Sequence, residues 1–291
     1  MQISTHNEWS PLQSVVVGSA AGANKPIDCH FDVTGEYPSE VIAQADADLD
    51  QFVSILEQEG VEVHRPKYNN FAQTQGMYNY CPRDRLLIVG DTVVDCHMQY
   101  DCRLQETKYL DFVLDNAKNV ITVPRNPRVR FDAANVCRLG QTFLYLQSVS
   151  GTRAGAKWLE EQFPNHNLEI TKTYGGVHID STFCPVNEGL VVVNKDRVSK
   201  LNLPNCFKDW EIIWLGSDDL PQKQYAGEAF ASNYILLNFF MIRPNLAVID
   251  DVPRLKEALD ANGVDSYVLP FTHSRTLGGG HHCCTLDLSR E

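Results

Sequence analysis

The residues best suited to chemistry lie at the end of the chain, where three glycines at 278–280 precede the sequence HHCC at 281–284. Glycine has no Cβ, so this backbone can adopt positive φ and let a ligand approach closely. Residues 285–288 alternate apolar and polar side chains, as a half-buried β-strand does. Because a cysteine at this junction is anchored by a strand and still faces a loop, Cys283 is a candidate nucleophile.

Two other interpretations of the HHCC sequence stand beside the nucleophile. Zinc ligands are usually separated by about two to four residues, and consecutive residues entering a strand point to opposite faces, so four adjacent ligands do not close one tetrahedron. A structural role is the stronger alternative, since free cysteine is among the most buried residue types and Cys283 and Cys284 could simply be packed inside. We therefore expect no metal site here, and the nucleophile needs partners elsewhere in the chain.

Those partners must activate the thiol, because a cysteine is only slightly ionised at neutral pH without a histidine or a cation beside it. The best candidates are in the sequence HIDSTF at 178–183, where we expect a strand that puts His178 and Asp180 on one face. Taken alone, such a pair more often serves the fold as a satisfied polar contact. A further carboxylate, Asp132, stands between Phe131 and two alanines, and a charge in such apolar surroundings usually has a partner.

Another carboxylate, Asp84 in the sequence PRD at 82–84, precedes one pair of expected strands as Asp132 precedes the next. A cavity lined by several carboxylates and one cysteine suits a cation. Guanidinium fits better than ammonium, because its planar fork can pair with two carboxylates at once. Arg197 could hold the carboxylate of an amino-acid substrate, although a solvated turn charge is the commoner role for such a residue.

The elements that must position these residues repeat along the chain with a period of roughly 50 residues. Each repeat has the pattern of two strands joined by a tight turn, then a helix and a third strand. The helix of the fourth repeat is weak. The expected strands are 15–17, 61–63, 86–89, 92–94, 120–123, 142–146, 168–170, 190–193, 211–215, 246–249, 267–269 and 284–288, and the expected helices pass through 49–56, 109–113, 158–159 and 255–259.

The first repeat lacks its opening strand, and the chain has one strand left over at 284–288. The simplest solution is a ring of five ββαβ units in which the C-terminus lies beside the N-terminus and the opening strands surround a central cavity. This is a mixed α/β fold, expected as one domain over residues 1–291, because no linker rich in Pro, Gly or Ser divides the chain. Composition alone does not separate this arrangement from a two-domain α/β sandwich.

Composition narrows the class of partner. The chain has 291 residues, 43% of them hydrophobic, and a net charge of -12, so it can bury a large core and repels nucleic acid and anionic membranes. We expect small-molecule substrates, and a homodimer stays an open alternative. No apolar run approaches the length of a membrane span, and the N-terminus lacks a secretion signal. Nine cysteines without framework spacing fit a reduced, cytoplasmic compartment.

These motifs together resemble the glycine and inosamine-phosphate amidinotransferases, a family of the guanidino-modifying, or pentein, superfamily. The resemblance spans most of the chain. The matching sequences, in order, are PRD at 82–84, FDAA at 131–134, HIDSTF at 178–183, the turn at Arg197, and LGGGHHC at 277–283.

The resemblance implies a five-bladed α/β propeller of ββαβ modules with pseudo-fivefold symmetry, in agreement with the repeat. It also implies a catalytic triad of Cys283, His178 and Asp132. No cofactor is expected, since the thiol itself would carry the transferred group.

The same resemblance implies that Asp84 and Asp180 hold the guanidinium, that Arg197 contacts the substrate carboxylate and that Ser232 lies near the substrate backbone. The chain departs from the family pattern at several positions near these motifs, which leaves the triad intact and bears on the identity of the acceptor. The departures are Asn135, Gly175, Gly176, His281 and Cys284.

The implied activity is transfer of the amidino group of L-arginine to an acceptor amine through an amidino-cysteine, with release of ornithine. A hydrolase of the deiminase or dihydrolase type would share the cavity and the covalent step, with water as the acceptor. A non-catalytic binding protein on the same propeller is a third interpretation. The joint presence of Cys283, His178 and Asp132 argues against it.

Overall fold

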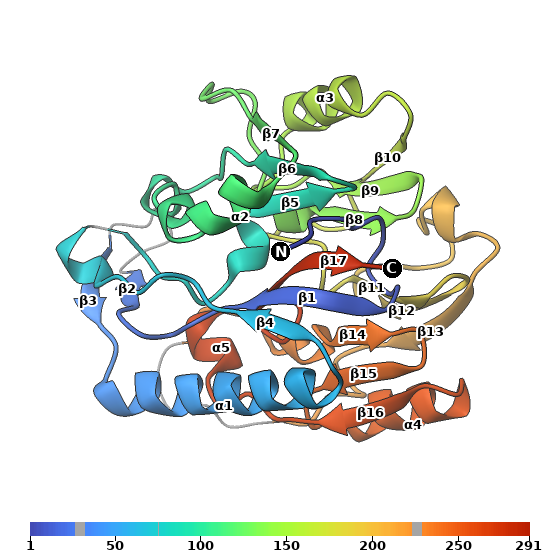
Figure 1. Ribbon diagram of the computed structural model, residues 1–291. Coiled ribbons are helices and arrows are strands. Elements are labelled where there is room, and N and C mark those ends of the chain that lie inside the picture. The colour runs from blue at the N-terminus through green and yellow to red at the C-terminus, as the bar shows by residue number, and fades with distance from the viewer. Residues whose placement is uncertain (27–32, 75, 223–228) are drawn as a thin grey trace.

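Five three-stranded sheets with one common topology make up the fold of this computed structural model, which describes residues 1–26, 33–74, 76–222 and 229–291 (Figure 1). In each sheet the central strand pairs antiparallel with one neighbour and parallel with the other. The sheets are β17-β1-β4, β5-β6-β7, β8-β9-β10, β11-β12-β13 and β14-β15-β16, and a short pair β2-β3 lies apart from them.

The strand bounds follow the expected repeat closely. They are β1 (Leu12–Val17), β2 (Asn24–Pro26), β3 (Val33–Glu36), β4 (Glu62–His64), β5 (Leu86–Val89), β6 (Thr92–Asp95), β7 (Asn119–Thr122), β8 (Val136–Leu139), β9 (Thr142–Leu146), β10 (Asn167–Thr171), β11 (Phe183–Asn187), β12 (Leu190–Asn194), β13 (Glu211–Leu215), β14 (Phe240–Arg243), β15 (Leu246–Ile249), β16 (Asp265–Val268) and β17 (Thr285–Arg290).

Helices supply the crossovers that parallel strands require, and they lie on the outside of the sheets (Figure 1). They are α1 (Ser39–Gln58), α2 (Asp111–Asn116), α3 (Arg153–Gln162) and α4 (Pro253–Ala261). The fourth unit crosses over with only a 3₁₀ turn at Asn205–Phe207, as its weak helical pattern predicts. A further short helix, α5 (Ser274–Leu277), precedes the last glycines.

Closure of the ring by the C-terminus is confirmed. Strand β17 pairs antiparallel with β1, with Val16 opposite Leu286, so the two ends of the colour scale lie side by side in Figure 1. The extreme N-terminus adds to this joint, because the Ser4 N–H donates to the Leu288 carbonyl at 2.8 Å. The first unit is therefore completed by the last strand of the chain.

The long helix α1 shows how the core supports the last loop. It buries Ala45, Leu49, Phe52 and Leu56, spaced by four, three and four residues as on one helical face. Burying each of the larger side chains contributes roughly 1.5–3 kcal/mol. The Phe52 ring packs edge-on against His281, 5.4 Å away between ring centroids, so the helix supports the segment that carries Cys283.

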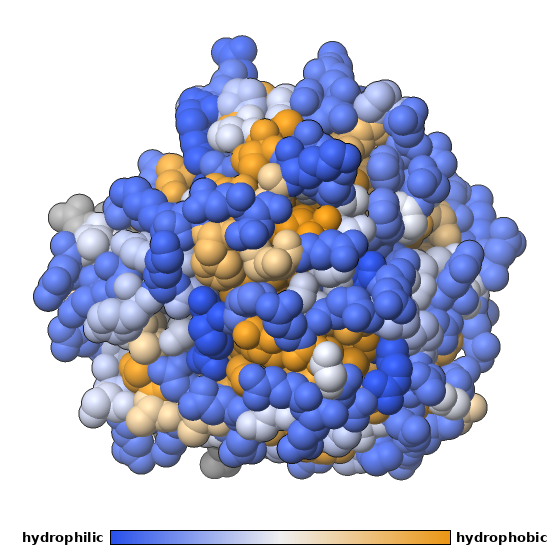
Figure 2. Space-filling model, viewed as in Figure 1, coloured by the Kyte–Doolittle hydropathy of each residue, from blue (hydrophilic) through white to orange (hydrophobic). Residues whose placement is uncertain are grey.

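The surface is largely hydrophilic on the face seen in Figure 2, and the hydrophobic residues on this face gather mainly in patches near its centre. Within the part of the chain that the structure describes, no helix is long and apolar enough to cross a membrane.

Candidate active site

One cavity of about 1040 Å³ collects every residue that the sequence singled out for the site. The remaining lining includes apolar and aromatic side chains such as Tyr37, Val41, Tyr174 and Phe230. Residues far apart in the chain thus meet in one place, as the ring predicts. The seven are Asp84, Asp132, His178, Asp180, Arg197, Ser232 and Cys283.

His178 lies between two carboxylates. Its Nε2 is 3.0 Å from Asp132 Oδ2 and its Nδ1 is 3.5 Å from Asp84 Oδ1. Asp132 is itself held in place, because its Oδ1 accepts the Gln99 backbone N–H at 2.8 Å. Burial alone would lower the pKa of His178, but the Asp84 charge and the hydrogen bond and charge of Asp132 raise it to about 9. The imidazole is therefore protonated at neutral pH.

The backbone around His178 corrects the expectation of a strand at 178–180. His178 has φ 57°, in the left-handed region, and β11 begins only at Phe183. Left-handed backbone costs a non-glycine residue about 1–2 kcal/mol, which surrounding contacts must offset. The Tyr174 hydroxyl donates to the His178 carbonyl at 2.7 Å, and the Ile179 N–H donates to the Ala134 carbonyl at 2.9 Å. These contacts join the His178 loop to the segment that carries Asp132.

Cys283 is fixed at the tip of the glycine-rich loop. Gly278 ends α5 with φ 81°, a left-handed conformation that glycine adopts without strain. The Cys283 N–H donates to Asn238 Oδ1 at 2.9 Å, and its Sγ lies 3.4 Å from Asp180 Oδ2. A hydrogen bond with Cys81, burial and the Asp180 charge raise the pKa of Cys283 well above its ordinary value. These surroundings therefore favour the neutral thiol form of the nucleophile candidate.

Asp84 forms an ion pair with Arg103, a residue of the cavity lining that sequence reasoning missed. Arg103 Nη1 is 2.7 Å from Asp84 Oδ2, and the same guanidinium makes two 2.8 Å hydrogen bonds to Glu106. Arg103 also lies over the Tyr78 ring at 4.9 Å. Burial raises the pKa of Glu106 to about 7, with the Arg103 charge opposing that rise. One oxygen of Asp84 is thus engaged, while the other faces His178.

Arg197 is more than a solvated turn charge. Its guanidinium lies 4.0 Å from the Tyr174 ring centroid and 4.7 Å from that of Tyr234. Its Nη1 donates to Thr182 Oγ1 at 2.8 Å and to Ser181 Oγ at 3.1 Å. These contacts fix a cation at the side of the cavity, where an anionic group of a ligand can reach it. Cation–π contacts of this kind contribute about 0.5–2 kcal/mol each.

Ser232 and Asn238 border the same region. Ser232 is exposed at the rim of the cavity, directly before a 3₁₀ helix at Asn233–Leu237. Asn238 is buried and joins the loop to its neighbours, because its Nδ2 donates to the Asp180 carbonyl at 3.0 Å. Sequence reasoning missed Asn238, although it precedes the opening strand of the fifth unit just as Asp84 and Asp132 precede theirs.

We compared the sequence of this chain with those of known proteins. No family model matches the chain. Inosamine-phosphate amidinotransferase 1 of Streptomyces glaucescens is 35% identical over 339 aligned positions, covering 99% of this chain and 97% of that protein. An L-arginine:L-lysine amidinotransferase of Pseudomonas savastanoi pv. phaseolicola is 28% identical, with 99% and 94% covered.

Solved structures that resemble this fold also include amidinotransferases. The inosamine-phosphate amidinotransferase of Streptomyces griseus superposes with a TM-score of 0.91 at 32% identity, covering 99% of this chain and 97% of that one. An amidinotransferase of Microseira wollei from the saxitoxin biosynthetic pathway gives 0.92 at 26%, with the same coverage. DDAH from Pseudomonas aeruginosa gives 0.74 at 13% identity, covering 95% of this chain and 99% of that one, and shares the fold alone.

Five three-stranded mixed sheets closed into one ring are the fold of the pentein superfamily, as the likeness to amidinotransferases and to DDAH shows. The chain belongs to the amidinotransferase family of that superfamily and is a transferase of that family.

Proposed function

We propose that the protein moves the amidino group of L-arginine to an acceptor amine through a covalent intermediate on Cys283 and releases ornithine. The observation that carries the proposal is the shared cavity, in which Cys283 Sγ lies 3.4 Å from Asp180 and His178 lies between Asp132 and Asp84. The Pseudomonas relative is an L-arginine:L-lysine amidinotransferase, which supports the choice of arginine as the donor.

The carboxylates give the cavity its preference for a cation. Asp84 and Asp180 are 2% and 7% exposed, so their charges act in a medium that screens them poorly. A guanidinium placed between them would offset the charge of Asp180 that keeps Cys283 protonated. Substrate binding would therefore favour loss of the thiol proton to solvent.

The bound arginine then reacts in two half-reactions. The Cys283 thiolate attacks the guanidinium carbon, and the His178 imidazolium donates its proton to the departing nitrogen. The C–N bond breaks, ornithine leaves and an amidino group remains on sulfur. In the second half, the acceptor ammonium loses one proton to solvent and the free amine attacks the amidino carbon. Neutral His178 takes the second proton from the attacking nitrogen, and the C–S bond breaks, which restores the Cys283 thiolate and the His178 imidazolium. Asp132 orients His178 throughout, and no cofactor takes part.

Arg197 is suited to bind the carboxylate of arginine at the other end. Its guanidinium is fixed by two rings and two hydroxyls, so little entropy is lost when a carboxylate docks on it. Ser232, at the rim, would contact the backbone of the same substrate.

The cysteines fit a reducing compartment. Every cysteine that the structure describes is a free thiol, and Cys29 lies outside the described residues. We therefore infer a cytoplasmic location, where thiols stay reduced.

Incubation with arginine and an amine acceptor tests this function. We expect ornithine and an amidinated acceptor in equal amounts from the wild type and neither from Cys283→Ala. Cys284→Ala is the matched control, because Cys284 is the adjacent buried thiol, absent from the cavity lining, and should retain transfer. Citrulline, or ammonia released with ornithine in the absence of an acceptor, would show a hydrolase instead.

A further inference from the structure

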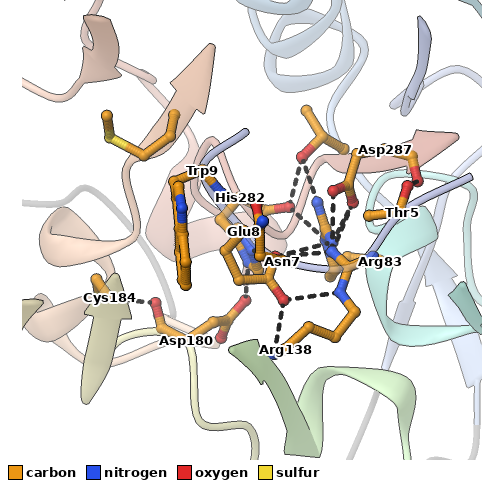
Figure 3. Close-up of polar contacts among 12 residues, drawn as sticks. Thr5, Asn7, Glu8, Trp9, Arg83, Arg138, Asp180, Cys184, His282 and Asp287 are labelled. Atoms are coloured by element: carbon orange, nitrogen blue, oxygen red, sulfur yellow. Dashed lines mark hydrogen bonds and ion pairs between the residues drawn. The ribbon is translucent and has the colours of Figure 1, made fainter. Parts of the chain in front are cut away.

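The imidazole of His282 lies between Asp180, a carboxylate of the cavity, and Glu8, a carboxylate of the N-terminal segment (residues 1–11, before β1) (Figure 3). Its Nδ1 is 2.9 Å from Asp180 Oδ2, and its Nε2 is 3.2 Å from Glu8 Oε2. Neither His282 nor Glu8 is part of the proposed reaction. The arrangement nevertheless connects the first residues of the chain to a carboxylate that touches the nucleophile.

Geometry fixes the protonation of this ring. Ionised carboxylates only accept hydrogen bonds, and a neutral imidazole carries only one N–H. Two carboxylate contacts through two ring nitrogens therefore need an imidazolium. Burial and the Arg83 charge favour the neutral ring, but the hydrogen bonds to Asp180 and Glu8 raise the pKa of His282 above its ordinary value.

Glu8 is itself anchored, so it can hold the ring in place. Arg138 binds Glu8 in a bidentate manner, with Nε 2.9 Å from Oε1 and Nη2 2.7 Å from Oε2. Arg83 lies 3.5 Å from Glu8 and also bonds Asp287, which Arg138 contacts at 2.9 Å. Burial would raise the pKa of Glu8, but these arginines and His282 hold it well below its ordinary value.

Other charged and titratable groups surround His282 and Asp180, among them the His178 imidazolium, whose charge also lowers the pKa of Asp180. Arg83 faces it from the 3₁₀ turn Pro82–Asp84, and its Nε donates to the His282 carbonyl at 3.4 Å. Cys137 and Cys184 are buried thiols beside it, and the Phe240 ring lies 6.4 Å away between centroids. Arg290 belongs to the same charge cluster but bonds Asp287 and the Ser10 carbonyl. Of the described residues, only His282 makes an ion pair with Asp180.

The low pKa of Asp180 depends on its ion pair with His282. Its Oδ2 is shared between His282 Nδ1 and Cys283 Sγ, at 2.9 and 3.4 Å. Burial would raise the pKa of Asp180, but the hydrogen bond and charge of His282, with smaller contributions from the His178 charge and an Asn238 hydrogen bond, bring it to about 2. A neutral group at position 282 would leave a buried carboxylate with less compensation, and that carboxylate would take up a proton more easily.

We propose that His282 is a positioning residue: as an imidazolium held by Glu8, it keeps Asp180 ionised and oriented beside Cys283, ready to bind a guanidinium. This inference rests on the proposed function, because it assigns the guanidinium to Asp180. It gives the N-terminal segment a part in substrate binding, although none of its residues lines the cavity.

The variant His282→Gln tests the proposal, because glutamine keeps a donor and removes the charge. We expect the KM for arginine to rise about tenfold or more, as for loss of a charge-assisted contact, with a smaller change in kcat. We also expect an acid limb in kcat/KM that the wild type lacks above about pH 5, because His282 makes the largest contribution to lowering the pKa of Asp180.

His281→Gln is the matched control. His281 is the adjacent buried histidine, and its Nε2 is 2.8 Å from the Leu269 carbonyl, away from Asp180. Its loss should lower thermal stability and leave the pH profile of kcat/KM unchanged. An equal fall in activity at all pH values in both variants would mean that His282 serves the fold alone and would overturn the proposal.

If His282→Gln does not fold, an NMR measurement on the wild type tests the protonation of His282 directly. The ¹⁵N shifts of His282 in labelled protein report whether each ring nitrogen carries a proton. We expect both to be protonated at pH 7, and one unprotonated nitrogen would contradict the inference. Failure of the wild type to form ornithine from arginine would instead count against the proposed function, while the NMR result would stand by itself.

Discussion

The surroundings of Cys283, the proposed nucleophile, favour its neutral thiol form, and a bound substrate cation would offset the Asp180 charge that contributes to this. The pKa of Cys283 is raised well above its ordinary value by Cys81, burial and Asp180, whereas the pKa of His178 is raised to about 9. The resting pair is thus a thiol and an imidazolium, rather than a thiolate and an imidazolium. A buried neutral thiol is also a poor target for oxidants, because the thiolate is the reactive form.

Asp132→Asn tests the part of this arrangement that concerns His178. The pKa of His178 lies above its ordinary value, so the ring is protonated at neutral pH and loses its proton as pH rises through about 9. Without the Asp132 charge that pKa falls. We expect the alkaline limb of ornithine formation to move to lower pH and the rate at neutral pH to drop about 10²–10⁴-fold.

Ornithine release measured across pH checks this expectation. Asp111→Asn makes the same change at an exposed aspartate paired with Lys67, outside the cavity lining, and should behave as the wild type. An alkaline limb that stays in place in Asp132→Asn would mean that Asp132 does not set the proton affinity of His178.

At the scale of elements, the sequence predicts what is periodic and misses what depends on contacts across the ring. The apolar runs of β5, β6, β9 and β12 and the helical spacing in α1 are local signals, and each of these elements lies where expected. The short helix α5 is four residues long and shows no such period.

The loop that carries His178 shows most clearly where prediction from the sequence fails. The spacing of His178 and Asp180 predicts a strand, but His178 has a left-handed conformation. The Tyr174 hydroxyl donates to the His178 carbonyl, and the Ile179 N–H donates to the Ala134 carbonyl. The seven predicted site residues still meet at one cavity. Asp84, Asp132, His178, Asp180 and Ser232 precede the opening strand of a unit, Cys283 lies in the last loop, and Arg197 follows β12. Arg103 lies in a segment without periodicity, so only the folded structure reveals its contact with Asp84.

Gly279→Ala tests the role of the glycine-rich loop as an element. A Cβ at Gly279 would lie 2.4 Å from Cys81 Sγ and 3.3 Å from Cys283 Cβ, so the nucleophile or its neighbour must shift. We expect destabilisation of about 1–3 kcal/mol and at least a tenfold loss of kcat.

Gly140→Ala serves as the control for the loop, because it has φ 69° in the turn between β8 and β9 and nothing within 4 Å. It should lower stability by about 1 kcal/mol through backbone strain and retain kcat. Thermal melts measure the change in stability of both variants, and steady-state kinetics measure the change in kcat. Full activity of Gly279→Ala would show that close packing of the loop is not needed for catalysis.

At the scale of the molecule, the two ends of the chain are joined at the centre. Arg138, in the third unit, contacts Glu8 near the N-terminus and Asp287 in β17, and all three side chains are less than 10% exposed. β17 also completes the sheet of β1. Since neither end can separate without exposing or unpairing buried charges, we expect residues 1–291 to unfold as a single domain.

Arg138→Met tests this joint. Removing one partner from a buried ionic group leaves uncompensated charge, so we expect the free energy of unfolding to fall by about 3–5 kcal/mol. Urea unfolding followed by tryptophan fluorescence and by circular dichroism should give one coincident transition in both proteins. Arg254→Met, which breaks an exposed pair with Glu257, should cost less than about 1 kcal/mol. Two separated transitions would contradict the single domain.

The proposal that Cys283 carries the amidino group is tested by the mass of the protein after incubation with arginine labelled at the guanidinium carbon. We expect an added amidino group that contains the label, located on the peptide with Cys283, and its disappearance when an acceptor amine is added. Turnover of arginine without any such adduct, or an adduct that persists in Cys283→Ala, would contradict it.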